Sequence, residues 1–121
     1  TLALLKDELP NDVLFQFQGN YGLPDYLIKS RKTIADAKYK PIYQGNSFDI
    51  DNIRQISGYA RDMKVRNELG ASELEELKCL IIYPDQSSAN LDLKNLDTRL
   101  QSIVQFSGFY KIGVKLPTIE N

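Results

Sequence analysis

Two aspartates and a lysine, side chains suited to metal-assisted chemistry, lie on two segments that we predict to be neighbouring strands. Segments 25–30 and 32–40 both have strand character and adjoin each other, which favours a hairpin. A two-residue loop between them places Asp25 directly opposite Asp36, with the side chains ~5 Å apart. Lys38 comes two residues after Asp36 and therefore projects from the same face of the sheet.

Two like charges at that distance destabilise a sheet unless something compensates them. A divalent cation such as Mg²⁺ does so, because it binds oxygen ligands and typically uses one or two carboxylates together with water and substrate phosphate. Lys38 could then hold an attacking water or stabilise negative charge that develops on phosphorus. The alternative is an exposed hairpin with ordinary surface charges. The opposite face of the second strand carries Ala35 and Ala37, which are small enough for a helix to pack closely.

The composition excludes several kinds of active site. There is no histidine, so histidine general acid–base chemistry, Ser-His-Asp triads and histidine-ligated metals are all excluded. The single cysteine, Cys79, excludes an intrachain disulfide and suits a reducing compartment. No base accompanies Cys79, so we interpret it as a buried apolar residue and not as a nucleophile.

The charge is distributed unevenly along the chain. Between Pro24 and Arg66, nine basic and five acidic residues give a net charge of +4, whereas the whole chain carries −1. A local basic zone can hold phosphate even in a slightly acidic protein, although a solvated surface explains the same pattern. We see no signal peptide and no apolar run that could span a membrane, and we expect a cytoplasmic protein without a membrane partner.

Hydrophobic patterns predict the remaining elements. Segment 13–18 reads as a strand with Val13, Phe15 and Phe17 on one face, and 78–84 as a central buried strand. Segment 47–69 reads as one long helix, capped by Ser47 or Asp49 and stopped by Gly70. Its predicted apolar stripe consists of Ile50, Ile53, Ile56, Ala60 and Met63.

The two ends are less strongly patterned. Residues 2–9 could be the tail of a helix. Near the other end, Leu93, Leu96, Leu100 and Ile103 would suit a helix, but we prefer a hairpin over 100–117 with Ser107-Gly108 at its tip. Strands on both sides of a long helix predict an α/β domain with a mixed sheet. We expect residues 1–121 to form a single domain that is a fragment of a longer chain.

The stretch PDYLIKSRKTIADAK resembles the PD-(D/E)XK motif of restriction-endonuclease-like nucleases: Pro24-Asp25, ten residues, then Asp36-Ala37-Lys38. The following helix carries Gln55 and Tyr59, similar to the QxxxY element of the RecB-like branch. The order of the segments DAKYKPIY, RQISGYARD and LIIYP is similar to that in the nuclease domain of McrC-type subunits of modification-dependent, McrBC-like restriction systems.

The resemblance implies a restriction-endonuclease-like core, with a mixed β-sheet flanked by helices, that cleaves DNA phosphodiester bonds with Mg²⁺ or Mn²⁺. Asp25, Asp36 and the Ala37 carbonyl would bind the metal, and Asp25, Asp36 and Lys38 would be catalytic. Other residues would contact DNA or orient the site: Lys40, Arg54, Gln55 and Tyr59. Related nucleases often add a glutamate from an N-terminal helix, for which Glu8 is the candidate here.

The resemblance also implies a prokaryotic, cytoplasmic setting and a partner, a nucleotide-hydrolysing motor subunit of the AAA+ GTPase-like kind. Two alternatives remain open. The domain could keep the nuclease fold but act as an assembly or DNA-binding module that docks onto the motor without cutting DNA. It could also act on RNA or on flapped ends.

Overall fold

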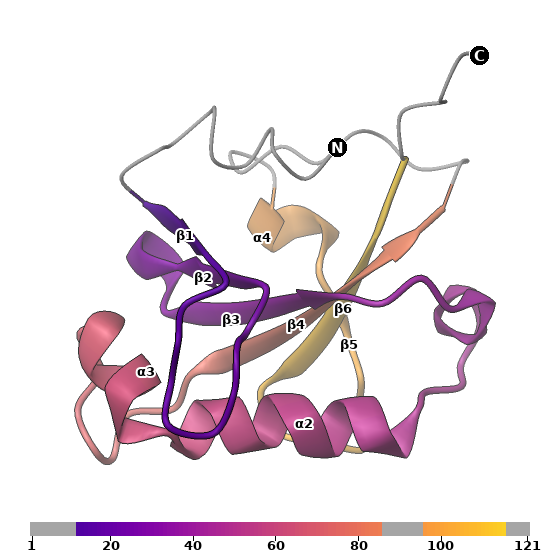
Figure 1. Cartoon of the computed structure of the whole chain (residues 1–121). Coiled ribbons are helices and arrows are strands. Elements are labelled where there is room, and N and C mark those ends of the chain that lie inside the picture. Colours follow the sequence, from indigo (N-terminus) through magenta and orange to yellow (C-terminus); the bar gives the residue numbers. More distant parts are fainter. Residues whose placement is uncertain (1–11, 86–95, 116–121) are drawn as a thin grey trace, which may run out of the picture.

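A mixed β-sheet with a helix across one face organises the described part of the chain, residues 12–85 and 96–115 of a computed structural model (Figure 1). The strands are β1 (Val13–Phe15), β2 (Tyr26–Ile28), β3 (Thr33–Ala37), β4 (Lys78–Pro84), β5 (Gln101–Ser102) and β6 (Phe109–Val114). The α-helices are α2 (Ile50–Arg61), α3 (Met63–Glu68) and α4 (Leu96–Arg99), and the 3₁₀ turns are η1 (Lys29–Arg31) and η2 (Pro41–Gln44). The predicted α/β class with a mixed sheet is thereby confirmed.

The strand order is β1-β2-β3-β4-β6-β5. The first three strands form an antiparallel meander, β3, β4 and β6 are parallel, and β5 returns antiparallel to β6. β4 lies in the middle, and its apolar run is buried on both faces. A strand between two parallel neighbours is covered on both sides, which is why its sequence is continuously apolar and does not alternate.

The predicted register of the hairpin is confirmed. Tyr26 pairs with Ala35, and Ile28 pairs with Thr33. The turn between them is η1, and it closes at Lys32, which takes a left-handed backbone conformation with φ 45°. This register fixes which side chains of β3 share a face with Asp25, because a slip of one residue would invert every side chain.

Two hydrophobic clusters cover the two faces of the sheet. The face under α2 carries Leu27, Ile34 and Ile81, which pack with Ile53 and Ile56 of the helix. The other face carries Ile28, Ala35, Leu80, Ile82, Ile112 and Val114, which pack with Leu96 of α4. Figure 1 shows α2 and α4 on opposite sides of the sheet. The long helix thus covers the face of Ile34 and Asp36, and the short α4 covers the Ala35 face that we expected to receive a closely packed helix.

The long predicted helix is interrupted at Asp62. Asp49 caps α2 as predicted, since its side chain accepts a hydrogen bond from the Asp51 N–H at 2.9 Å. Asp62 has an extended backbone, ψ 115°, and its carboxylate caps α3 by accepting from the Lys64 N–H at 2.9 Å. The same carboxylate accepts from the Tyr21 N–H at 2.8 Å. An aspartate with several backbone partners competes with the helix, which explains the break.

The break also corrects the predicted apolar stripe. Ile53 and Ile56 are buried, and Ala60 packs partly against the core. Ile50 and Met63 are instead 41% and 43% exposed, because each begins a helix at the end of the packed surface. Gly70 ends α3 with φ +68°, as predicted for a helix stop.

The first and last segments differ in detail from the prediction. Val13 is buried with the Ala35 face, but Phe17 packs against the opposite cluster because Gln16 turns the chain with φ 49°. The preferred C-terminal hairpin is confirmed between β5 and β6, and among the described residues 96–115 the helical ones are those of α4. The segments 2–9, 93–95 and 116–117, which earlier predictions included, lie outside the described residues.

Candidate active site

Asp25 and Asp36 meet where β2 begins and β3 ends. Asp36 is inside β3 and 2% exposed, while Asp25 immediately precedes β2. One oxygen of Asp36 accepts a hydrogen bond from the Asp25 N–H at 2.8 Å, and one oxygen of Asp25 accepts from the Ala37 N–H at 2.9 Å. Each carboxylate therefore accepts a hydrogen bond as a peptide carbonyl would. The hydrogen bonding between the two chain segments thus continues beyond the first residue of β2. This contact fixes the distance between the two acids.

Burial and the second carboxylate raise the pKa of Asp36. Burial has the largest effect, the hydrogen bond from Asp25 opposes it, and the charge of Asp25 raises the pKa further. Lys38 lowers it again, and the result is a pKa of about 6. At pH 7 the site therefore holds a second negative charge that the protein alone does not fully compensate, which favours binding of a cation.

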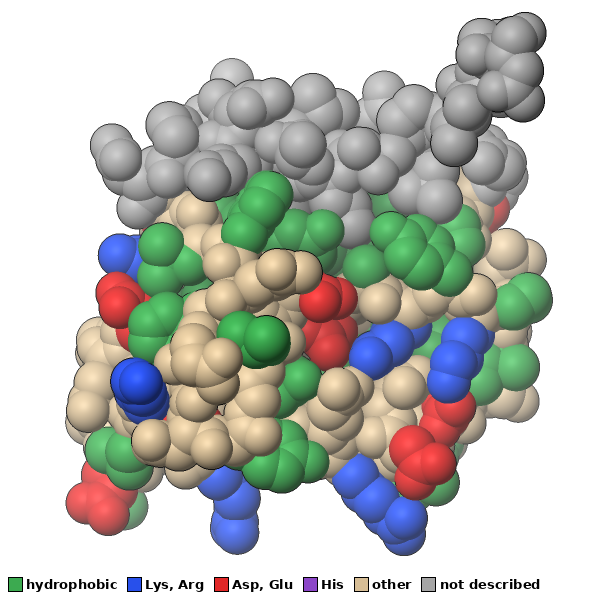
Figure 2. All heavy atoms as spheres, in the orientation of Figure 1, with side chains coloured by type: hydrophobic (Ala, Val, Ile, Leu, Met, Phe, Trp, Pro, Cys, Tyr) green, Lys and Arg blue, Asp and Glu red, His purple; other side chains and the backbone are tan. Residues whose placement is uncertain are grey.

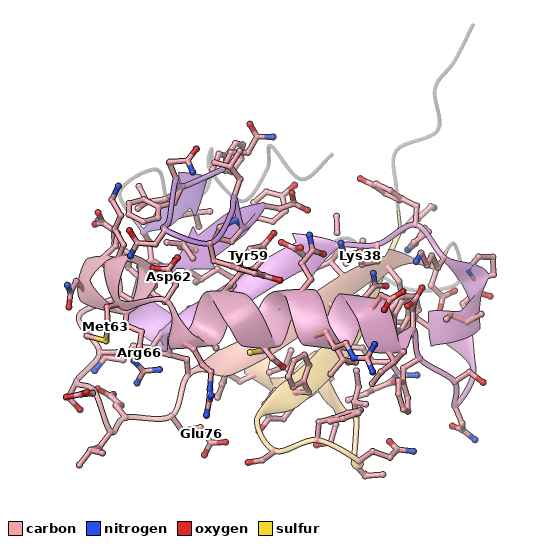
Figure 3. The ribbon with its side chains drawn as sticks, turned by 60° about the horizontal axis from the view of Figure 1, so that its bottom comes forward. Lys38, Tyr59, Asp62, Met63, Arg66 and Glu76 are labelled. Carbon is pink, nitrogen blue, oxygen red and sulfur yellow. The ribbon has the colours of Figure 1, made fainter. Side chains whose placement is uncertain are left out.

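Lys38 connects the acids to α2. Its ammonium lies 3.4 Å from Asp36 and donates a hydrogen bond to the side-chain oxygen of Gln55 at 2.7 Å. The side chain is only 17% exposed. Figure 3 shows Lys38 and Tyr59 along the same side of α2. The amide of Gln55 thus limits the positions that the ammonium can take beside Asp36.

Tyr59 lies one turn after Gln55 and is buried. Its hydroxyl is 3.4 Å from the Leu23 carbonyl, to which it donates a hydrogen bond. Burial first, and then the negative charge of Asp36, raise the pKa of Tyr59, so the phenol stays neutral. Its ring packs edge-on against Tyr21, with centroids 5.6 Å apart. Tyr59 therefore supports the loop that leads into Asp25.

Lys40 and Arg54 lie apart from the acids. In the described structure, the ammonium of Lys40 pairs with the carboxylate of Asp49, the cap of α2. Arg54 pairs with Asp51 at 3.5 Å and is 73% exposed on the outer face of the helix. Of the four residues that we predicted to contact DNA or orient the site, the structure thus brings Gln55 and Tyr59 to the acids and leaves Lys40 and Arg54 outside.

Two carboxylates and one carbonyl at this position are the kind of oxygen ligands that Mg²⁺ binds. The Lys38 N–H donates to Ile82 of β4, whereas the Ala37 N–H faces Asp25. Since the N–H and C=O of a strand residue point to the same side, the Ala37 carbonyl also faces Asp25. Among residues 12–85 and 96–115, no third acidic, cysteine or histidine side chain joins the pair. Glu8, the predicted additional ligand, lies outside that range.

Figure 2 shows acidic and basic side chains that adjoin near the middle of one face, with hydrophobic ones close by. Sequence reasoning missed two of the nearby aromatic residues, Tyr26 and Tyr39, which line a pocket together with Asp25. The signal was their position, since Tyr26 follows Asp25 directly and Tyr39 follows Lys38.

Cys79 is buried as predicted, and burial together with the charge of Glu76 raises the pKa of its thiol to about 12.

No model of a known protein family matches the chain, and neither does any curated protein or any solved structure. The case for a function therefore depends on the geometry of the site and on the motif in the sequence. In the part of the chain with described coordinates, we find no helix with the length and apolar character needed to cross a membrane.

Proposed function

We propose that the chain is a metal-dependent nuclease domain with a restriction-endonuclease-like core, which hydrolyses phosphodiester bonds of DNA. One observation carries the proposal. A buried aspartate, a second aspartate directly before the neighbouring strand and a lysine held by a glutamine meet at one end of the sheet. The charges of Asp36 and Asp25 are costly to hold together without a cation, so stability alone does not account for them.

In this proposal, Asp25, Asp36 and the Ala37 carbonyl hold Mg²⁺, with Mn²⁺ as a substitute. The bound cation would supply positive charge for the phosphate and lower the pKa of a water. A water releases one proton to solvent and its oxygen forms the new bond to phosphorus. The bond from phosphorus to one ester oxygen breaks, and that oxygen leaves with a proton taken from solvent.

Lys38 acts on the charge that develops during this step. Its ammonium is beside Asp36 and can donate hydrogen bonds to phosphate oxygens or to the attacking water. Gln55 is a positioning residue, because it accepts a hydrogen bond from Lys38 and leaves the remaining N–H groups of the ammonium for the substrate. Lys40 and Arg54 contribute positive charge at a distance and would bind the DNA backbone.

The wider setting follows from the resemblance of the motif to McrC-type subunits. We propose a prokaryotic cytoplasmic enzyme that acts with a nucleotide-hydrolysing motor of the AAA+ GTPase-like kind. The competing proposal is a module of the same fold that docks onto such a motor and binds DNA without cutting it. The two proposals agree about Asp25 and Asp36 as structural features, but only the first gives Lys38 a role in cleavage.

Cleavage of plasmid DNA with Mg²⁺, in the presence of any partner encoded beside the protein, separates them. Lys38→Ala should lower the cleavage rate more than a hundredfold, because such a group contributes on the order of 3 kcal/mol to the transition state. Lys40→Ala is the matched control, since it removes the same charge two residues away and should mainly weaken DNA binding. If Lys38→Ala cuts DNA at the wild-type rate, the cleavage does not come from this site and the nuclease proposal is wrong. Wild-type protein that binds DNA and its partner but leaves the DNA uncut supports the docking module.

A further inference from the structure

A second feature adjoins the candidate active site: a pocket of about 430 Å³ beside Asp25. The described residues that line it are Phe15, Gln16, Asp25, Tyr26, Ala37 and Tyr39. Two of these, Asp25 and Ala37, are also the proposed metal ligands. A phosphate held at the acids would therefore lie next to this pocket, on the side where Asp25 and Ala37 belong to both.

Most of the other described residues that line the pocket are aromatic. The rings of Phe15 and Tyr26 pack edge-on with centroids 5.1 Å apart, which fixes one wall. Tyr39 is 61% exposed and lies outside the strands, so its ring can offer a face to a ligand. Aromatic faces bind nucleobases by stacking, and every base has such a face. The chemistry of the pocket therefore matches a flat aromatic ligand better than an aliphatic one.

A polar side chain is held at the same pocket by an unusual backbone conformation. Gln16 has φ 49°, which costs energy for a residue with a side chain, and its N–H donates to the Asp25 carbonyl at 3.0 Å. This hydrogen bond connects the backbone of Gln16 directly to that of Asp25, one of the two acids. Its amide offers both donors and an acceptor, the groups that hydrogen-bond to the edge of a base.

We infer that this pocket, referred to below as the aromatic pocket, binds an unstacked nucleobase next to the phosphate that is cleaved. The inference rests on the proposed function and narrows its substrate. A base in a duplex is stacked between its neighbours, so the base at the cleaved phosphate must leave the stack before it enters, which costs least in single-stranded or locally unpaired DNA. The base stacks on Tyr39, and Gln16 contacts its edge.

The test measures binding of a single-stranded oligonucleotide and of the corresponding duplex by fluorescence anisotropy. Tyr39→Ala should weaken single-strand binding by about tenfold or more, and Tyr39→Phe, which keeps the ring, by less than about twofold. Duplex binding should change little in either variant. Leu74→Ala is the control for loss of an exposed apolar side chain, because Leu74 is 96% exposed and lies outside the aromatic pocket.

Removing one base from the oligonucleotide tests the same contact from the other side. An abasic site at the position next to the cleaved phosphate should weaken binding to the wild type but not to Tyr39→Ala. The inference is wrong if the abasic oligonucleotide binds the wild type equally well, or if Tyr39→Phe loses as much affinity as Tyr39→Ala. Circular dichroism of each variant confirms that the fold is retained.

Cleavage assays on the same preparations separate this inference from the proposed function. Wild-type protein that cuts DNA with Mg²⁺ but binds single strands independently of Tyr39 would overturn the aromatic pocket alone. Protein whose single-strand binding depends on Tyr39 but which never cuts would support the pocket and overturn the nuclease proposal.

Discussion

Replacing Asp36 by asparagine should stabilise the fold and destroy the site. Burial and the charge of Asp25 raise the pKa of Asp36 to about 6, against an ordinary value of 3.8. Because one pKa unit corresponds to about 1.4 kcal/mol, ionising Asp36 costs on the order of 3 kcal/mol more in the folded protein than in the unfolded chain. Asparagine carries no charge and keeps an oxygen that can accept from the Asp25 N–H.

The size of this stabilisation depends on pH in a defined direction. The folded protein holds the Asp36 proton more tightly than the unfolded chain, so folding takes up a proton between about pH 4 and pH 6. Ionisation of Asp36 therefore lowers the wild-type free energy of unfolding as the pH rises from about 4 to 6. Asp36→Asn lacks this loss, and its advantage should grow from near zero below pH 4 to a plateau of about 2–3 kcal/mol above pH 7.

Urea unfolding followed by circular dichroism measures this difference, since the chain has no tryptophan. Asp51→Asn is the control, because it removes one negative charge at a side chain that is 82% exposed and should show no such growth between pH 4 and pH 6. Saturating Mg²⁺ at pH 8 should reduce the difference in the free energy of unfolding between Asp36→Asn and the wild type, because the cation binds and stabilises only the folded wild type. A variant that is less stable than the wild type at pH 8, or a gap that does not change with pH, would refute the account of Asp36.

Four further predictions follow from other contacts. Mn²⁺ affinity, measured by calorimetry, should fall about tenfold per pH unit below pH 6, because Asp36 must lose its proton to bind the cation. Arg66→Lys should lower the free energy of unfolding by about 2 kcal/mol or more, since the buried guanidinium donates to the carbonyls of three residues (Ala60, Ser72 and Glu75) and lysine cannot reach them all. Asp62→Ala should cost about 1–2 kcal/mol in urea unfolding, and Asp62→Asn much less, because asparagine can still cap α3. Cys79 should resist a thiol reagent in the native protein and react once denaturant exposes it; rapid native labelling would show that the strand opens.

The sequence predicted the part of the site that depends on local pairing. The distance of eleven positions between Asp25 and Asp36, with a short turn between them, was enough to pair the two strands, because alternation of side chains fixes the face once the register is known. The spacing of four between Gln55 and Tyr59 likewise placed both residues on one face of α2.

The predictions that were wrong or missing concern contacts between residues far apart in the sequence. The residues near Asp62 in the sequence do not predict that the N–H of Tyr21, forty-one positions away, donates a hydrogen bond to the Asp62 carboxylate. This hydrogen bond helps to end the helix. The pairing of Lys40 with Asp49 was missed for a similar reason, since η2 folds the chain back onto the start of α2. The side of the sheet that α2 covers was also not readable, because Ala35 and Ile34 are both apolar and either face could have received the helix.

The two outer strands of the sheet have a consequence for how other proteins can associate with it. β1 has three residues and is followed by the turned Gln16, and β5 has only two residues. A protein that binds by adding a strand, or an aggregate that grows in this way, needs a longer row of outward N–H and C=O groups. Within the described ranges these rows are short, so a partner must recognise side chains on the helices and turns, and sheets from two copies have little backbone to join.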